Sequence, residues 1–200
     1  MARYTGPKWK VSRALSYPVF GDDDYQARPN KPGQHASKPR RNSSAYAAQF
    51  MEKQKVKKTY GLLERQFAKI FTNASKDQGN TGSKLLELLE MRLDNLVYRS
   101  KLAKTRAQAR QMVTHGHVTV NGKKLDIPSY TVKVGDEIRV ISKISEADWF
   151  KQVKEDLKSS TEPHKWIEIL DNGAKVVSVP APDMFDKSFN TQLVVEYYNR

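Results

Sequence analysis

Apolar side chains in the middle of the chain recur at steps of three and four residues, the spacing of one face of a helix. The stretch KLLELLEMRLDNLVYRSKL, with Ser83 before it as a cap, predicts a helix over residues 84–102. A second helix is predicted to begin at Thr105, because Thr105 and Gln108 can form a capping box. We expect the first helix to bury one stripe of side chains: Leu86, Leu89, Leu93, Leu96 and Val97.

After Gly116, which is predicted to end the second helix, the pattern changes to the alternation typical of strands. Val118 and Val120 precede Asn121-Gly122, the strongest short-range signal for a β-hairpin. The stretch YTVKVGDEIRVI repeats this alternation on both sides of Gly135-Asp136. Residues 83–142 therefore predict a module of two helices and a small sheet, which makes the fold class α+β.

A helical domain is predicted over residues 43–82. Ser43 or Ser44 can cap its first helix, and Gly61 marks a break between two helices. The turn cluster KDQGNTGS indicates a joint before the next module. Apolar positions predict an inward face made of Tyr46, Phe50, Tyr60, Leu63, Phe67 and Ile70. The opposite face is expected to present its cations to solvent: Lys53, Lys55, Lys57 and Lys58.

The two ends of the chain have weaker patterns. Residues 1–42 contain many turn formers and cations and little periodicity, so we expect a basic extended arm that orders on a polyanion, with a disordered tail as the alternative. In residues 143–200, SEADWFKQVKEDLK predicts a helix. HKWIEILDN and KVVSVPAP predict short strands or extended segments, and TQLVVEYYNR predicts a terminal strand. This C-terminal segment is expected to pack back on the helical domain and complete it.

The charge pattern favours nucleic acid as the partner. The 200 residues hold 35 Lys and Arg against 22 Asp and Glu, a net charge of +13, and the mean hydropathy is −0.72. The cations concentrate in residues 1–60 and 83–142, whereas residues 143–200 are slightly acidic. The absence of cysteine excludes disulfides and thiolate metal sites. Without an apolar run of about 18 residues or a secretory signal, we expect an intracellular protein with no membrane contact.

The second predicted helix carries the candidate chemistry. Arg106 and Arg110 lie at positions i and i+4 and therefore share a face. A cation at a helix start is mildly unfavourable for the helix, whereas a phosphate there would be favoured by the free amides and by the planar guanidinium. If the hairpin folds back on this helix, four lysines join the same edge: Lys101, Lys104, Lys123 and Lys124.

Several motifs, in the same order along the chain, resemble one family. RLDNLVYR and TRAQARQMVTHGHVTVNGKKLDIPSYTVKVGDEIRV are similar to the S-four RNA-binding domain. MARYTGPKWKVSR, PGQHA, MEKQKVKKTYGLLERQF, GNTGSKLLELLEMRLDNLVYR and QLVVEYYNR resemble further parts of the bacterial S-four family of small-subunit ribosomal proteins. The chain departs from that pattern in having no cysteines in its arm, and in Ala36 where the family's loop has glycine.

The resemblance implies a structural protein of the cytoplasmic ribosome. It would be a primary binder of small-subunit ribosomal RNA at a multi-helix junction and would nucleate assembly. It also implies a place beside ribosomal proteins S-three and S-five at the messenger-RNA entry channel, and a part in translational accuracy. Operon repression and antitermination vary within the family.

Candidate RNA contacts follow from the cations together with the resemblance, and the terminal segment offers candidate protein contacts. The RNA-binding candidates are Arg3, Lys8, Lys10, Arg13, His35, Lys38, Arg40, Arg41, Lys53, Lys55, Lys57, Lys58, Arg92, Lys104, Arg106, Arg110, His117, Lys123 and Lys124. The candidate contacts with S-five are Gln192, Glu196 and Tyr197.

Enzymatic chemistry finds little support. Asp94 stands in an Arg-Leu-Asp context that resembles the catalytic aspartate of pseudouridine synthases, but an amphipathic helix continues after it, so we expect a surface acceptor that pairs Tyr98 or Arg99. Four scattered histidines and no P-loop predict no metal, cofactor or small-molecule substrate. The competing functions are an RNA-modifying enzyme, for which Asp94 would be catalytic, and a regulatory RNA-binding protein that acts off the ribosome.

Overall fold

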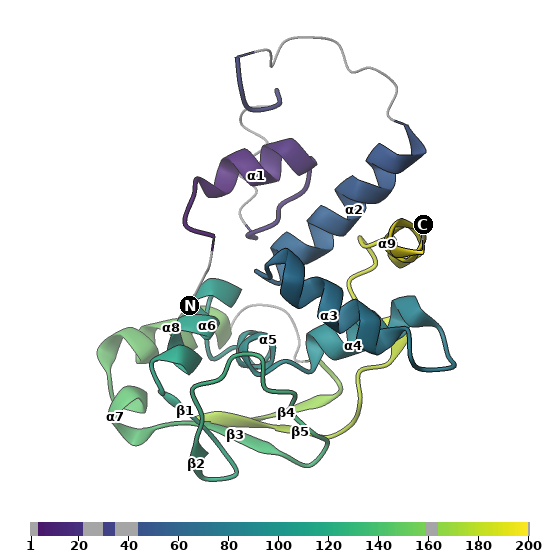
Figure 1. The fold of residues 1–200 in the computed structure, drawn as a ribbon. Helices are drawn as coiled ribbons and strands as arrows, with labels where there is room; N and C mark the ends of the chain where they lie inside the picture. Colours follow the sequence, from purple (N-terminus) through teal and green to yellow (C-terminus); the bar gives the residue numbers. More distant parts are fainter. Residues whose placement is uncertain (1–3, 22–29, 35–43, 159–163, 200) are drawn as a thin grey trace. The chain divides into compact units, whose positions relative to one another are not determined.

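The computed structural model describes residues 4–21, 30–34, 44–158 and 164–199 (Figure 1). The chain forms two compact units, which we call the helical unit (residues 1–85 and 186–200) and the sheet unit (residues 86–185). The mixture of helices and one antiparallel sheet confirms the predicted α+β class. The predicted boundary at residue 142 differs from this division, because residues 143–185 add strands and a helix to the sheet unit.

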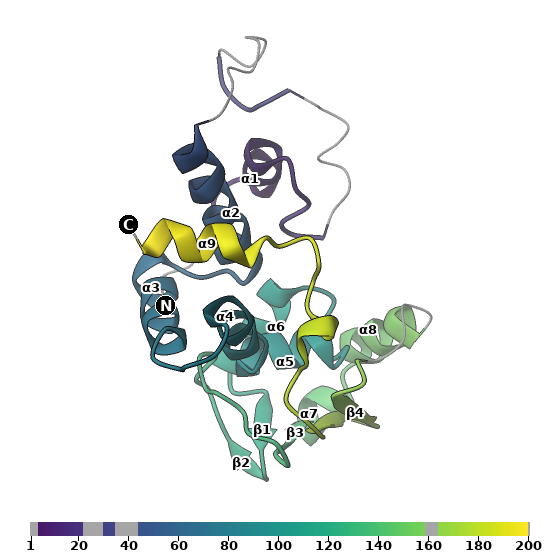
Figure 2. The same ribbon diagram turned by 90° about the vertical axis from the view of Figure 1, so that its right-hand side faces the viewer.

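The helical unit is built around two helices from distant parts of the sequence. Its helices are α1 (Lys8–Leu15), α2 (Ala45–Thr59), α3 (Glu64–Ala74), the first half of α4 (Thr81–Glu90) and α9 (Thr191–Tyr198). Helix α9 crosses α2 and packs against it (Figure 2). Val56, Phe67, Ala74 and Val194 are fully buried and form the centre of this unit.

Local signals set the ends of these helices. The Ser44 hydroxyl accepts a hydrogen bond from the amide of Ala47 (3.2 Å), as predicted for the start of α2. Gly61 has a φ of +64°, the left-handed conformation that lets the chain turn between α2 and α3. Ser83 does not cap α4; the helix begins two residues earlier, and the side chain of Asn80 accepts hydrogen bonds from the amides of Gly82 and Ser83.

The prediction of a terminal strand was wrong, because residues 191–198 form helix α9. Asn190 caps this helix by accepting a hydrogen bond from the amide of Leu193. The β-branched pair Val194-Val195 favours a strand locally. Burial of Val194 against the other helices of the unit overrides that preference.

The predicted extended arm also contains a helix. Residues 8–15 form α1, which ends at Ser16 in the left-handed conformation (φ +52°). The guanidinium of Arg13 reaches forward to the carbonyl of Asn30 (2.7 and 2.9 Å). Part of the arm is therefore held by contacts within the chain.

The sheet unit has five antiparallel strands in the order β2-β1-β3-β5-β4. Helices α5 (Leu93–Arg99) and α6 (Arg106–Thr114) lie on one face of this sheet (Figures 1 and 2). The strands are β1 (Val118–Val120), β2 (Lys123–Lys124), β3 (Glu137–Val140), β4 (Ile167–Leu170) and β5 (Gly173–Val176). The remaining elements are α7 (Ser142–Ser145), α8 (Asp148–Lys158) and the 3-10 helix η2 (Pro182–Met184).

The register of the strands places alternate side chains in the core. Val118 pairs with Val140, and Val120 pairs with Ile138. All four side chains are buried beneath α5 and α6. Asn121 and Gly122 both have positive φ (50° and 77°), so the predicted Asn-Gly hairpin is confirmed. The stretch around Val132 forms only an isolated bridge between Thr131 and Arg92 and is not the predicted strand.

The predicted helix over residues 84–102 is two helices, α4 and α5, with a break at Met91-Arg92. The amides of Leu93 and Asp94 bond to the carbonyls of Tyr130 and Pro128, and the amide of Val132 bonds to the carbonyl of Met91. Tertiary hydrogen bonds therefore replace helical ones at the break. The predicted stripe remains buried on both sides of it.

Candidate nucleic-acid interface

Helix α6 begins where the sequence predicted. The Thr105 hydroxyl accepts a hydrogen bond from the amide of Gln108 (3.2 Å), and the Gln108 side chain accepts one from the amide of Lys104 (2.9 Å). This reciprocal cap fixes the first turn of the helix. It places Arg106 at the helix start and Arg110 one turn later.

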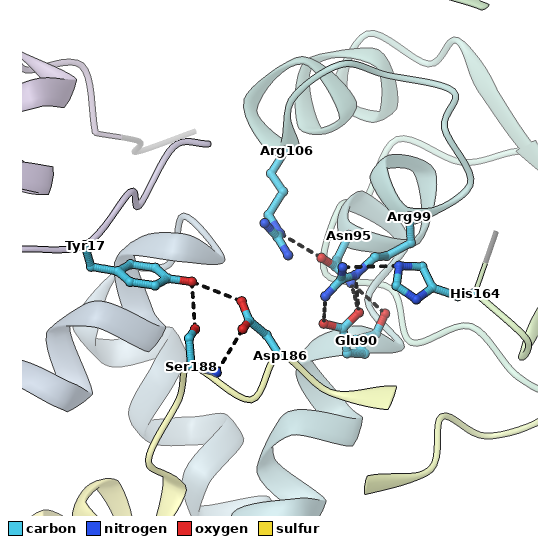
Figure 3. A network of polar contacts seen from close by, with 8 residues as sticks. All are labelled: Tyr17, Glu90, Asn95, Arg99, Arg106, His164, Asp186 and Ser188. Carbon is cyan, nitrogen blue, oxygen red and sulfur yellow. Dashed lines mark hydrogen bonds and ion pairs between the residues drawn. The ribbon is translucent and has the colours of Figure 1, made fainter. Parts of the chain in front are cut away.

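Arg106 is held against α5 by two contacts, of which Figure 3 shows the hydrogen bond to Asn95. Its Nε donates to Oδ1 of Asn95 (2.9 Å), and its guanidinium carbon lies 4.5 Å from the centre of the Tyr98 ring. The side-chain nitrogen of Asn95 in turn donates to the carboxylate of Glu90. Arg99 donates two hydrogen bonds to the same carboxylate (2.7 and 2.9 Å). A buried polar network thus determines where this cation points.

Arg110 belongs to a second polar group, inside the fold. Arg92 makes two hydrogen bonds to Asp94 (2.8 and 3.1 Å), and Arg110 lies 3.6 Å from the same carboxylate. Arg92 and Asp94 are 4 % and 5 % exposed, so the expectation that Asp94 is a surface acceptor for Tyr98 or Arg99 was wrong. Burial lowers the pKa of Arg110, Asp94 opposes this effect, and Arg92 adds to it.

These two groups hold more cations than anions. We call the four guanidinium groups the arginine cluster (Arg92, Arg99, Arg106 and Arg110). Three of them bind the buried carboxylates of Glu90 and Asp94, and Arg106 bonds to Asn95. The arginine cluster therefore gathers several guanidinium groups, whose planar fork suits an oxyanion, in one place.

A second cationic feature lies where α6 meets β1. The aliphatic end of Lys124 packs against Gly116, whose φ of +68° and missing side chain make room for it. The rings of His115 and His117 lie 5.8 Å apart on either side of that glycine. We call these four residues the basic corner. The hairpin does fold back toward the end of α6, bringing Lys124 to the histidines.

The surroundings of His117 in the basic corner disfavour its protonation. Burial lowers the pKa of His117, and the neighbouring His115 and Lys124 lower it further. Lys123 and Lys124 are exposed, as is Lys104, which pairs with Asp156. These three lysines remain accessible to a ligand.

The expectation that the lysines of α2 form a solvated face was wrong. Lys53 and Lys57 are 3 % and 7 % exposed, and both bind the carboxylate of Glu64 (2.8 and 2.6 Å). Lys55 pairs with Glu52 (3.3 Å) and sits over a tyrosine ring. Long lysine side chains can cover apolar surface and reach carboxylates that the fold brings close. The periodicity of a helix does not show where such carboxylates will lie.

The remaining RNA-binding candidates lie on α1, at the end of α2, or outside the described residues. Lys8 and Lys10 are exposed on α1, and Lys58 is half-buried with its amine 4.6 Å from the centre of the Tyr4 ring. Arg13 is bonded to the chain's own carbonyls. Five predicted contacts lie outside the described residues: Arg3, His35, Lys38, Arg40 and Arg41.

Contacts between distant segments also close the helical unit. The hydroxyl of Tyr17 donates to Asp186 (3.0 Å) and accepts from Ser188 (2.9 Å), while the Ser188 amide bonds to Asp186 (Figure 3). This group joins the segment after α1 to the segment before α9. The sequence contained no signal for it.

The predicted protein contacts lie on α9 but differ in accessibility. Gln192 and Glu196 are exposed and bonded to each other, and Glu196 also accepts from Gln49 (3.0 Å). Tyr197 packs against Tyr46 and Phe50, with ring centres 5.7 and 6.1 Å apart. We call these three aromatic residues the aromatic patch.

Asn95 and Tyr98, which touch Arg106, were not among the predicted site residues. A signal existed: in RLDNLVYR an asparagine interrupts an otherwise apolar stripe. A buried asparagine needs partners for its amide, and its partners here come from α4 and α6.

Within the described ranges, no group of three or more acidic or histidine side chains is arranged to hold a metal ion. None of the helices in those ranges has the length and apolarity to cross a bilayer.

Acidification is expected to weaken the sheet unit through His164. The Nε2 atom of His164 lies 3.2 Å from a guanidinium nitrogen of Arg99, and burial, followed by that arginine, lowers the pKa of His164 below its ordinary value of 6.5. The folded unit thus binds this proton less tightly than the unfolded chain does. Its contribution to stability is complete above pH 6.5 and is lost as the pH falls through 6.5 toward the folded pKa.

The substitution His164→Gln keeps a hydrogen-bond acceptor and removes the titration. It is expected to flatten the decline in unfolding free energy between about pH 7 and pH 5. Nuclear magnetic resonance titration of the imidazole, alongside urea unfolding at each pH, provides the measurement. An imidazole that titrates above 6.5 contradicts this account.

Comparison with known proteins covers the whole chain. The model of the Ribosomal protein S4/S9 N-terminal domain matches residues 3–90, and the model of the S4 domain matches residues 91–138. A small ribosomal subunit protein uS4 of Roseiflexus castenholzii is 47 % identical over the full length of both chains. Proteins of the same name from Corynebacterium ammoniagenes and Christiangramia forsetii are 43 % and 44 % identical, also over their full lengths.

These relatives carry the name of a structural ribosomal protein and not of an enzyme, in agreement with the predicted absence of catalysis. The name also agrees with the predicted location in the small subunit of the ribosome. The two matching domains and the full-length identity together show that the chain belongs to the uS4 family of small ribosomal subunit proteins.

Proposed function

We propose that this chain binds small-subunit ribosomal RNA at a multi-helix junction and so nucleates assembly of the subunit. The observation that carries the proposal is the arginine cluster, in which three guanidinium groups bind two buried carboxylates and that of Arg106 is bonded to Asn95. Phosphate oxygens fit the planar fork of a guanidinium. The basic corner, where α6 meets β1, adds the exposed Lys124 in the same unit.

The mechanism is binding without turnover. Guanidinium and ammonium groups neutralise phosphates that are crowded where RNA helices meet, and release their counterions. A rigid protein surface selects the shape of the junction, because the deep major groove of RNA hides the bases of a duplex. Arg106, Lys104, Lys123 and Lys124 are the proposed contacts in the sheet unit, with Lys8 and Lys10 in the helical unit. Arg92, Lys53 and Lys57 support the surface from inside the fold.

The experiment that tests the proposal is a salt-titrated binding assay of the full chain. It compares a ribosomal RNA fragment containing a multi-helix junction with a plain duplex of equal length. We expect junction binding to be at least tenfold tighter and to persist at raised salt, because shape is being recognised. Equal affinities that fall together with salt would reduce the interaction to nonspecific binding of a polyanion.

The double substitution Lys123→Ala with Lys124→Ala is expected to weaken junction binding and to lower the slope of log affinity against log salt by about two. Each lysine releases roughly one counterion when it meets a phosphate. The matched control is Lys175→Ala, an exposed lysine of the same sheet that pairs across strands with Glu137 and Glu168. An unchanged slope in the double variant removes Lys123 and Lys124 from the interface.

We further propose that the aromatic patch contacts ribosomal protein S-five. Tyr46 is 50 % exposed and Phe50 is 36 % exposed, which is unusual for large apolar side chains that stack together.

A place beside S-three at the messenger-RNA entry channel and an effect on translational accuracy are supported by the family resemblance. The substitution Tyr46→Ser in the assembled subunit should then raise misreading without loss of RNA binding.

A further inference from the structure

The side chain of Asn95 is oriented from behind by a buried carboxylate. Asn95 and Glu90 are each 2 % exposed. The Asn95 amide nitrogen donates to the Glu90 carboxylate (2.7 Å) and to the Glu90 carbonyl (3.1 Å), which uses both of its hydrogens. Arg99 holds the same carboxylate in place from the other side. The direction of the remaining Asn95 atom, the carbonyl oxygen Oδ1, is therefore fixed.

That oxygen is bonded to Arg106. It accepts a hydrogen bond from Nε (2.9 Å; Figure 3). The Tyr98 ring lies against the face of the guanidinium at 4.5 Å. The hydrogen bond to Asn95 determines which edge of the guanidinium faces α5, and the Tyr98 ring determines the orientation of the guanidinium plane. An arginine side chain that is already ordered loses less rotamer entropy on binding a ligand.

The hydrogen bond between Asn95 and Arg106 suits an arginine that binds an anion. Asn95 is a neutral amide, so it orients the guanidinium without neutralising it. The neighbouring carboxylates of Glu90 and Asp94 are bonded by Arg99, Arg92 and Arg110. An aspartate in place of Asn95 would hold Arg106 equally close but would add a negative charge at this contact, whereas Asn95 adds none.

We infer that Asn95 is a positioning residue that aims the Arg106 guanidinium at a phosphodiester of the bound RNA. The inference rests on the proposed function. Glu90 and Asn95 then contribute to RNA affinity without touching the RNA. Two hydrogen bonds, from Asn95 to Glu90 and from Arg106 to Asn95, connect α4, α5 and α6 and so hold the Arg106 guanidinium in place.

The test is a double-mutant cycle on the full chain with the junction RNA fragment. Asn95→Leu should weaken binding about three- to tenfold, because Arg106 is present but no longer held in place. Its salt slope should stay unchanged, since no charge is lost. Arg106→Ala should lower the slope by about one, and Asn95→Leu added to Arg106→Ala should cost nothing further.

Two further variants separate positioning from folding. Arg106→Lys keeps the charge and leaves Asn95 and Glu90 untouched, so it should reproduce the loss seen for Asn95→Leu even if that variant is unstable. Gln111→Leu, an exposed amide on α6, should leave binding unchanged.

The outcomes distinguish this inference from the proposed function. Additive losses for Asn95→Leu and Arg106→Ala, or full affinity of Arg106→Lys, overturn the positioning role while junction binding by the unmodified chain stands. If the unmodified chain shows no preference for the junction, the proposed function fails, and the positioning role fails with it.

Discussion

Replacing Asp94 by asparagine is expected to cost the sheet unit about 3–5 kcal/mol of unfolding free energy, the usual effect of removing one partner from a buried ion pair. The side chain of Arg92 is 5 % exposed and that of Arg110 is 13 % exposed, so neither guanidinium can turn to water when its carboxylate is lost. Asp94 also accepts a hydrogen bond from the amide of Asn95. Urea unfolding followed by the fluorescence of the buried Trp166 measures the loss.

Two controls make this result specific. Asp126→Asn removes an exposed carboxylate of the same unit and should change stability by less than about 0.5 kcal/mol. Replacing Arg92 and Asp94 together by apolar residues of similar size should recover much of the loss, because no buried charge is left alone. A small effect of Asp94→Asn would show that water reaches this pair. Asp94 would then regain the surface role that its helical context had suggested.

Protonation of Glu64 at acid pH is expected to weaken the attachment of the C-terminal helix α9. This carboxylate receives hydrogen bonds from Lys53, Lys57 and Tyr198 (2.8, 2.6 and 2.9 Å). Burial opposes these bonds, but together they lower the pKa of Glu64 from 4.5 to about 2. The lowered pKa means that the stabilisation is complete above pH 4.5 and is lost as the pH falls through 4.5 toward 2.

Solvent screening reduces the stabilising free energy that Glu64 contributes. A pKa difference of this size corresponds to about 3 kcal/mol without screening. The Glu64 side chain is 47 % exposed, so we expect about 1–2 kcal/mol for Glu64→Gln at neutral pH. Hydrogen exchange of the α9 amides should rise in this variant and should no longer respond to acid near pH 4. Asp77→Asn, which breaks an exposed pair with Lys84, is the matched control. Protection of α9 that does not change in Glu64→Gln removes Glu64 from the support of this helix.

The Glu64 contacts also show why the lysines of α2 were misassigned. In the sequence, four lysines at close spacing appear as a solvated face. In the fold, the turn after α2 brings Glu64, the first residue of α3, to Lys53 and Lys57, and α9 adds Tyr198. Periodicity identifies one face of a helix, but it does not identify which later segments will cover the other face.

The sequence by itself determined the features that depend on neighbouring residues. The caps at Ser44 and Thr105 and the Asn121-Gly122 hairpin follow from side-chain and backbone chemistry within three residues. The buried stripe from Leu86 to Val97 follows from helical spacing. The motifs in their order along the chain also sufficed to recognise the family.

Only the tertiary structure decided which charged groups remain available and which segments belong together. Asp94, Arg92 and Lys53 are polar residues that became buried because partners from other elements satisfied them. Residues 191–198 became a helix because packing against α2, and of Tyr198 against two phenylalanine rings of α3, outweighed the local preference of two valines. Long-range contacts supply most of the free energy at such positions, and the positions of those contacts are not encoded within any short stretch of the chain.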